Sequence, residues 1–439
     1  MKRALALLAL VLGLLVVGAV PASAHVEIIS STPGDGARLT AAPSLVSVTL
    51  SENIGIQPGS IKVVDLSGKQ AETGPVFQPG DVAEQVAVRL EPGLPDGSYL
   101  VEYAFVSADS HPVRGTFAFV VGTGPLVTSA GAVSAATGTD PAVDAVSTAV
   151  RWLAYLGVVL LGGLAFVLLC RPGARTDGRA RRLLRWGAGL VGVMASAAFV
   201  LQGPYVAGRD LAAVADPALL ADTLRVAYGK LLLLRLVAVG ALAVCTARLL
   251  GPSDRLRPRF ENLAMVAGFL VLLTFSATGH PVTDPIMYFS VSADLVHFGA
   301  IAIWAGGLIQ LALCLYRPAD GEDVAGVAAR FSRLAAGAVT AIALSGAVLA
   351  LRIMPSLTSL WTTRFGLLVL LKIAGFAALL AVASRSRRAV RRMATPAPGG
   401  TATLTTDLRR LRLAVSTEVL LSVVVLALAA FLTVTPPGG

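Results

Sequence analysis

The chain has 439 residues, of which 55% are hydrophobic and only 14% are charged, and its formal net charge at pH 7 is +10. Soluble proteins carry about 25% charged residues, so this composition excludes an ordinary soluble protein. Residues 25–122 hold 5 Lys/Arg against 11 Asp/Glu, whereas residues 123–439 hold 29 against 15. Because most of the basic excess lies between apolar runs, it indicates membrane topology and not a nucleic-acid partner.

The first 24 residues have the features of a secretory signal peptide. Two basic residues precede an apolar run at 4–20, and residues 22–24 read Ala-Ser-Ala, which matches an A-x-A cleavage site. Cleavage after residue 24 makes His25 the first residue of the mature chain. It then carries a free α-amine beside its imidazole, which gives two nitrogen donors on one residue. The alternative, that His25 stands there by accident of the cleavage site, is open until other residues are considered.

Residues 26–121 predict an all-β domain. Six segments mix β-branched and aromatic residues with partial alternation: VEIISS, LVSVTLSE, SIKVVDL, EQVAVRL, GSYLVEYAFVS and GTFAFVVG. Turn signals such as PGDG, QPGD and LPDG separate them. Six or seven short strands in about a hundred residues predict a Greek-key β-sandwich of the cupredoxin or immunoglobulin-like kind. Residues 123–145 are small and polar without periodicity, which predicts a flexible linker.

The remainder, residues 146–435, predicts an all-α membrane domain that crosses the bilayer eight times. The eight apolar stretches that are long enough to cross lie at 150–170, 187–208, 229–250, 262–280, 291–315, 334–354, 364–384 and 414–434. A signal peptide places the β-domain outside, so the first helix runs inward. The loops then expected in the cytoplasm hold 20 basic residues and the outer loops hold 4, in agreement with the positive-inside rule. We therefore expect a multi-pass protein of the plasma (inner) membrane, with the N-terminal domain and the C-terminus outside the cytoplasm.

Two pairs of membrane segments resemble each other in sequence. YGKLLLLRLVAVGALAV (228–244) resembles FGLLVLLKIAGFAALLAV (365–382), which aligns Arg235 with Lys372, and GGLAFVLLCRP (162–172) resembles GGLIQLALCLYRP (306–318). Both pairs predict a parallel repeat of four helices, an arrangement found in transporters. The alternative is the general similarity of helices that are rich in Leu, Ala and Val. Arg235, Lys372 and Glu418 are charges near or within these spans, and they either pair with one another or extend to an interface.

The exported domain contains only two histidines, His25 and His111. In SADSHPVRG (107–115), Asp109 precedes His111 by two residues, so both side chains face the same side of an extended segment. Together with His25 they provide an α-amine, two imidazole nitrogens and a carboxylate oxygen, a tetragonal donor set that suits Cu(II). Glu52 is a candidate outer carboxylate that orients a ligand or bound water. This combination favours a metal site over a simple turn capped by Asp109.

These segments resemble the periplasmic copper-binding CopC family. The resemblance rests on HVEIISSTPGDGA, TLSEN and SADSHPVRGTFAF, and it extends over the whole β-domain. It implies a cupredoxin-like sandwich that binds Cu(II) through His25, Asp109 and His111, with Glu52 as the outer carboxylate. Some members of the family also have a Met-rich Cu(I) site. This chain has no Met between residues 25 and 193, so we expect a domain that binds Cu(II) alone.

The other two histidines lie in TGHPVTDPIMYFSVSADLVHFGAIAIWAGGL (278–308). His280 is expected at the outer end of the fourth helix, and Asp294 and His297 share one face of the fifth helix at i and i+3. Met287, in the expected outer loop, adds a soft sulfur that suits Cu(I). Ionisable groups inside a bilayer are costly and usually mark a pathway or a site. The alternative is a structural Asp–His hydrogen bond, with His280 merely interfacial.

This second stretch resembles the CopD family of integral membrane proteins through its GH…D-x-x-H…W-x-GGL pattern. The whole chain therefore resembles a fused CopC–CopD protein, a copper resistance or copper transport protein of the membrane. The resemblance implies capture of copper outside the cell and transfer to a membrane component implicated in import. His280, Asp294 and His297 match the membrane pattern.

The favoured function is copper binding and transport without catalysis, with the copper ion and the lipid bilayer as partners. No GxxxxGK[ST] motif occurs in the chain, so the sequence gives no sign of ATP-driven pumping. One alternative is delivery of copper to an external copper enzyme without transport. The other is a copper-dependent oxidoreductase, which the carboxylate ligand and the absence of paired haem-type histidines disfavour. The sequence identifies no copper-donating or copper-accepting protein.

Overall fold

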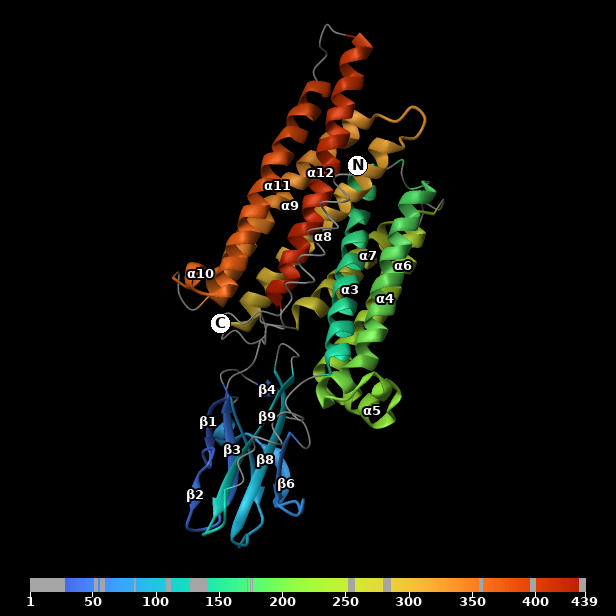
Figure 1. Ribbon diagram of the computed structural model, residues 1–439. Coiled ribbons are helices and arrows are strands. Elements are labelled where there is room, and N and C mark those ends of the chain that lie inside the picture. The colour runs from blue at the N-terminus through green and yellow to red at the C-terminus, as the bar shows by residue number, and fades with distance from the viewer. Residues whose placement is uncertain are drawn as a thin grey trace.

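The structure is a computed structural model with an N-terminal β-domain and a C-terminal helical bundle (Figure 1). It describes residues 28–50, 54–55, 60–82, 84–107, 112–126, 140–171, 173, 175, 177–251, 257–278, 286–354, 358–394 and 400–433.

The β-domain consists of two sheets. One has the order β1-β3-β7-β6, and its strands are Ile28–Thr32, Leu45–Leu50, Gln85–Leu90 and Glu72–Phe77 in that order. The other has the order β2-β9-β8-β4, with strands Arg38–Leu39, Pro112–Val121, Gly97–Ser107 and Ile54–Gly55, and β5 (Ile61–Asp65) also pairs with β8. The all-β prediction is confirmed for this part of the chain. Each of the six expected segments contains a strand.

The core of this domain is formed by apolar side chains of both sheets. Val48 and Val88 of one sheet and Val101, Phe105 and Phe119 of the other are fully buried. Three short or irregular strands, β2, β4 and β6, were not expected from the sequence. β6 reads ETGPVF, and its glycine and proline conceal the strand pattern. It lies at the edge of its sheet, where a proline is tolerated.

In the part of the chain that the structure describes, the helical domain has eight long helices: α3 (Pro141–Leu169), α4 (Gly178–Ala207), α6 (Ala227–Leu249), α7 (Arg257–Ser276), α8 (Met287–Tyr316), α9 (Val324–Ile353), α11 (Arg364–Ala394) and α12 (Gly400–Thr433). Each covers one of the expected apolar stretches. Within the described residues, seven of them are long and apolar enough to cross a membrane, and α12 occupies the eighth expected position. Two short helices, α5 (Pro217–Arg225) and α10 (Ser359–Thr362), precede α6 and α11.

The first helix begins five residues before the expected boundary at 146. The Asp140 side chain accepts hydrogen bonds from the backbone N–H groups of Ala142 and Val143 at 2.9 and 3.0 Å, and Pro141 occupies the first helical turn. An N-cap aspartate followed by proline is a strong helix start, which explains the earlier boundary. Of the expected linker, residues 127–139 lie outside the described part of the chain.

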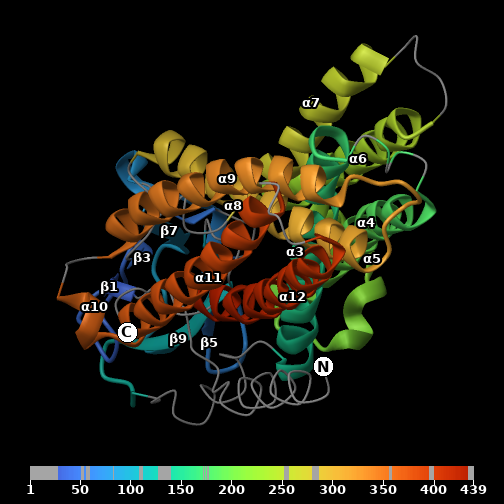
Figure 2. The same ribbon diagram turned by 90° about the horizontal axis from the view of Figure 1, so that it is seen from above.

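The two halves of the bundle have the same order of long and short helices, as a parallel repeat predicts. In each half the first two long helices pack together, the last two pack together, and a short helix precedes the third. The third helices begin alike: a Cβ atom on Gly229 would overlap the Thr223 carbonyl oxygen of α5, and one on Gly366 would overlap the Ser359 carbonyl oxygen of α10. Seen from above, α4 and α6 lie on one side, α11 and α12 on the other, and α3 and α8 between them (Figure 2).

The helices α3 and α8 join the two halves through glycines. A Cβ atom built on Gly306 of α8 would lie 2.5 Å from the backbone nitrogen of Gly163 in α3 and closer still to the Val159 carbonyl oxygen. Small residues let two helix backbones approach in this way inside a membrane. The GGL segments that suggested the repeat therefore form the contact between its halves.

Candidate metal centres

The expected outer ligands His25, Asp109 and His111 lie outside the described residues, as does Glu52. The strands on either side of them are described. Ile28 of β1 pairs with Leu50 of β3, and four residues later the chain enters β4, where Ile54 pairs with Ser107 of β8. The last pair of the β8–β9 hairpin joins Val106 and Pro112. The start of β1, the end of β3 and the tip of the β8–β9 hairpin therefore belong to one end of the sandwich.

This end of the sandwich, which we call the hairpin end, faces the helical bundle. Figure 1 shows β4 directed toward the end of the bundle from which α3 starts, and β8 contacts α4. The short helices α5 and α10 lie at the same end of the bundle (Figure 1). We call this the outer end of the bundle, because the sequence predicts that it lies on the outer side of the membrane.

The membrane candidates Asp294 and His297 lie in the outer half of α8, which begins with Met287. At a rise of about 1.5 Å per residue, Asp294 is about 10 Å and His297 about 15 Å from the start of the helix. His297 is buried, with 9% of its surface exposed, and Asp294 is half-buried. Their i, i+3 spacing keeps both on neighbouring parts of one helix face, as expected.

The imidazole of His297 is held by α9. Its Nδ1 lies 3.0 Å from the Ser345 hydroxyl oxygen and 3.2 Å from the Ile342 carbonyl oxygen. The Ser345 hydroxyl donates to the Ala341 carbonyl, so it accepts from the ring, and a carbonyl can only accept. Both contacts therefore place the proton on Nδ1. The Nε2 lone pair remains available, which is the usual arrangement of a histidine that binds a metal.

The carboxylate of Asp294 faces two other helices. Ser276 of α7 lies near it, although the Ser276 hydroxyl makes no hydrogen bond among the described residues, and Lys372 of α11 acts on it electrostatically. Lys372 also acts electrostatically on His297. The structure thus brings Asp294, His297 and Lys372 into one polar group among α7, α8, α9 and α11, and the Asp294 carboxylate has a cationic neighbour.

Two further candidates are not part of this group. Met287 lies two helical turns, about 10 Å, outside Asp294, too far for one metal ion to bind both side chains. His280 lies outside the described residues. Among the described residues no group of three or more His, Cys, Asp or Glu side chains gathers at one point. Asp294 and His297 could therefore supply at most two ligands of a metal site from the described residues.

Arg235 and Glu418, two further charges within the bundle, have hydroxyl or carbonyl partners among the described residues. Arg235 is buried and donates to Thr274 at 3.0 Å through Nε and at 2.7 Å to its carbonyl oxygen. Glu418 is buried and accepts a hydrogen bond from Ser386. Neither alternative left by the sequence, pairing with one another or extension to an interface, describes these two buried residues, which instead make hydrogen bonds to neighbouring helices.

Sequence reasoning missed the serines that surround the site. Ser345 and Ser276 carry no motif, because single serines are common in membrane helices, where they also bond their own backbone. Only the packing of α9 and α7 against α8 shows that these hydroxyl groups face His297 and Asp294.

Comparison with known families gives three matches in this chain. The CopC domain matches residues 28–122, the copper resistance protein D-like N-terminal domain matches residues 142–285, and copper resistance protein D matches residues 325–432. The first covers the β-domain, the second covers α3 to α7, and the third covers α9 to α12.

Known proteins resemble the chain in the same parts. Copper transport protein CutJ of Bacillus subtilis (strain 168) is 27% identical over 369 residues, a match of 81% of this chain and 66% of CutJ. Copper resistance protein D of Pseudomonas syringae pv. tomato is 31% identical over 260 residues, which is 56% of this chain and 82% of that protein. Among solved structures, CopC from Methylosinus trichosporium OB3b is 26% identical and matches 22% of this chain and 93% of its own, with a TM-score of 0.21.

Proposed function

Because the chain belongs to the fused CopC–CopD family of copper proteins, we propose that it captures Cu(II) outside the cytoplasm and passes copper to its membrane domain for import. The observation that carries the proposal is the orientation of the β-domain. Its hairpin end, next to which the three expected outer ligands and Glu52 stand in the sequence, faces the outer end of the bundle (Figure 1). Copper is the cargo in this scheme and no catalytic step is involved.

In the first step, the mature N-terminus binds Cu(II). His25 supplies the α-amine and imidazole nitrogens, and Asp109 and His111 complete the set from the β8–β9 hairpin. The strand pairings support this assignment, because the residues that flank all three belong to the hairpin end. Glu52 stands between β3 and β4 and orients a ligand or a bound water.

In the second step, copper moves to α8. Met287 stands at the start of α8 and meets the ion first, and the Asp294 carboxylate and the His297 Nε2 atom bind it deeper in the bundle. The fixed proton on Nδ1 of His297 supports this role, because it orients Nε2 as a donor before the ion arrives. Residue His280, which precedes α8 in the chain, supplies a further imidazole.

Lys372 neutralises Asp294 while the site is empty. A carboxylate in the membrane is costly unless a cation is near, and Lys372 is a described cation whose charge reaches Asp294. Copper entry then exchanges one cationic partner of Asp294 for another. The fused chain makes the transfer efficient because the linker keeps the two sites at high effective concentration.

The outer site is tested on the purified full chain by N-terminal sequencing and a Cu(II) titration followed by electron paramagnetic resonance. We expect a chain that begins at His25 and a tetragonal, nitrogen-rich signal, which His25→Ala removes. Glu102→Gln, which neutralises an exposed carboxylate on β8, is the matched control and leaves the signal unchanged. A mature chain that begins elsewhere, or an unaltered signal in His25→Ala, would refute the outer site.

The membrane site is tested by cytoplasmic copper content in cells that express the full chain. Asp294→Asn is expected to abolish the copper-dependent rise, and Glu418→Gln, which neutralises another buried carboxylate of the bundle, is expected to preserve it. Equal loss in both variants would indicate a general defect and contradict a site at Asp294. If the wild-type chain loads an external copper enzyme while cytoplasmic copper stays constant, import is wrong and external delivery takes its place.

A further inference from the structure

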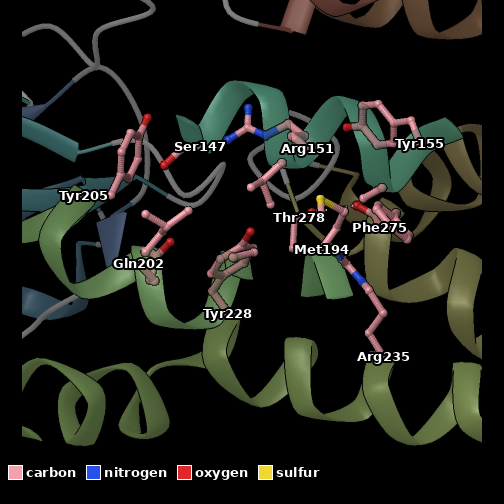
Figure 3. A pocket seen from close by; sticks show the side chains of 14 residues that line it. Ser147, Arg151, Tyr155, Met194, Gln202, Tyr205, Tyr228, Arg235, Phe275 and Thr278 are labelled. Atoms are coloured by element: carbon pink, nitrogen blue, oxygen red, sulfur yellow. Dashed lines mark hydrogen bonds between the residues drawn. The ribbon is translucent and has the colours of Figure 1, made fainter. Parts of the chain in front are cut away.

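A polar pocket opens in the first half of the bundle, and one of its lining residues, Tyr155, is also within electrostatic reach of Asp294 in the proposed copper site. The pocket lies among α3, α4, α6 and α7, with a volume of about 60 Å³. Arg151 and Arg235 line it together with the hydroxyl groups of Ser147, Tyr155 and Tyr228. In Figure 3 the two arginines approach the pocket from opposite sides, one from α3 and the other from α6.

The lining is rich in hydrogen-bond donors and contains no carboxylate. None of the fourteen residues that line the pocket is Asp or Glu. Arginine only donates, and tyrosine and serine hydroxyl groups can donate, so this lining favours an anion and repels a copper ion. The hydroxyl of Ser147 is buried without a hydrogen-bond partner among the described residues. Buried polar groups normally have a partner, so this hydroxyl is available to a bound ligand.

Arg235 forms the positive floor of the pocket. Only 4% of its surface is exposed. Its described partners are Thr274 and the ring of Phe275, whose centroid lies 3.5 Å from the guanidinium carbon. The structure pairs it with no carboxylate in the part of the chain that it describes. A buried guanidinium without a counter-ion is expensive, and a bound anion would remove that cost.

The pocket is the counterpart, in the repeat, of the copper site. Aligning Gly162 with Gly306 places Val150 on Asp294, because each stands 12 residues before the first glycine of its GGL segment. The third helices align Arg235 with Lys372. The first half thus has a cation, Arg235, at the position of Lys372. At the position of the Asp294 carboxylate it has Val150, which lines the pocket. One half holds a site for a cation, and the equivalent place in the other half has the charges for an anion.

The size of the pocket selects a small anion. Each water molecule takes up about 10–15 Å³ of such a cavity volume. The pocket therefore has room for roughly four groups of the size of a water molecule, which corresponds to roughly four non-hydrogen atoms. Guanidinium groups bind planar carboxylates through paired N–H donors. We propose that this pocket, built by Arg151, Arg235 and Tyr228, is a binding site for a small carboxylate of the size of acetate.

The test uses the full chain in nanodiscs of phosphatidylcholine, with radiolabelled acetate as the probe. A copper chelator is present, so the result does not depend on the proposed copper function. We expect saturable binding of one acetate per chain. Arg235→Gln is expected to weaken it at least tenfold. Arg225→Gln is the matched control, because this exposed outer arginine pairs with Asp222 on the surface and its loss leaves binding unchanged.

A second variant keeps the test decisive if Arg235→Gln does not fold. Tyr228→Phe removes one hydroxyl while it keeps the ring, and it is expected to weaken acetate binding severalfold. Absence of saturable binding to the wild-type chain, or equal affinity of the wild type and Tyr228→Phe, would overturn the proposal. Displacement of acetate by an equal concentration of chloride would overturn the carboxylate assignment, because it would show a site that selects charge alone.

Discussion

The contact between α3 and α8 allows a sharp test of how the two halves of the bundle are held together. A methyl group added at Gly306 would lie 2.5 Å from the Gly163 backbone nitrogen, whereas ordinary contacts begin near 3.4 Å. The helices would have to separate by at least about 0.9 Å at this point, and overpacking of this kind costs about 1–3 kcal/mol. Alanine regains about 1 kcal/mol of helix propensity. Gly306→Ala is therefore expected to destabilise the protein by up to about 2 kcal/mol.

The matched control is Gly240→Ala in α6. Gly240 is exposed and has no neighbouring atom within 4 Å of an added Cβ, so only the gain in helix propensity applies there. Thermal unfolding is followed with a thiol-reactive fluorescent dye, because Cys170, Cys245 and Cys314 are all buried until the bundle opens. We expect a lower Tm for Gly306→Ala and an unchanged or higher Tm for the control. Equal Tm values in the two variants would refute the close approach of α3 and α8.

Three further predictions follow from described contacts. Hydrogen bonds from Arg171 hold the pKa of Glu322 in the folded chain below its ordinary value of 4.5. The ionised Glu322 therefore stabilises the fold fully above pH 4.5, and this stabilisation is lost as the pH falls through the lowered pKa of the folded chain. Because Arg171 keeps Asp177 as a second carboxylate partner, Glu322→Gln is expected to destabilise the folded chain by about 1.5–3 kcal/mol at pH 7. A difference from wild type that does not shrink in acid would contradict the pairing. Gly366→Ala should lower the Tm by more than Gly240→Ala does in the same dye assay, because its methyl group would overlap a carbonyl of α10, and a Tm equal to that control would show that α10 can move away. Ser345→Ala removes a hydrogen bond to His297. It is expected to weaken copper binding to the bundle about tenfold and to lower the free energy of unfolding by about 1 kcal/mol. Unchanged copper affinity in a competition titration would show that Ser345 is not part of the site.

The sequence alone determined the architecture, because each part of it has a local cause. Strand alternation and turn residues predicted the six main β-segments, and apolar length predicted all eight long helices. Both patterns act over fewer than about 25 residues, so they can be read without knowledge of the fold. The family followed for a related reason: HVEIISSTPGDGA and SADSHPVRG are short, specific strings of residues. Strand β6 is an exception: its own residues do not show a strand pattern, and it forms a strand through its pairing with β7.

The tertiary structure decided which side chains meet. The i, i+3 spacing predicted that Asp294 and His297 share a helix face. Ser345 and Lys372, which act on His297, stand 48 and 75 residues farther along the chain, on other helices. The sequence could not choose a partner for Arg235, since Thr274 stands on another helix and has no distinctive motif. Contacts between helices depend on how each helix is rotated about its axis and on the angle at which two helices cross. Small residues such as glycine permit a close crossing, but the apolar pattern of a helix in lipid does not show which of its faces meets another helix. That is why the spans were predictable from the sequence, and the pocket between them was not.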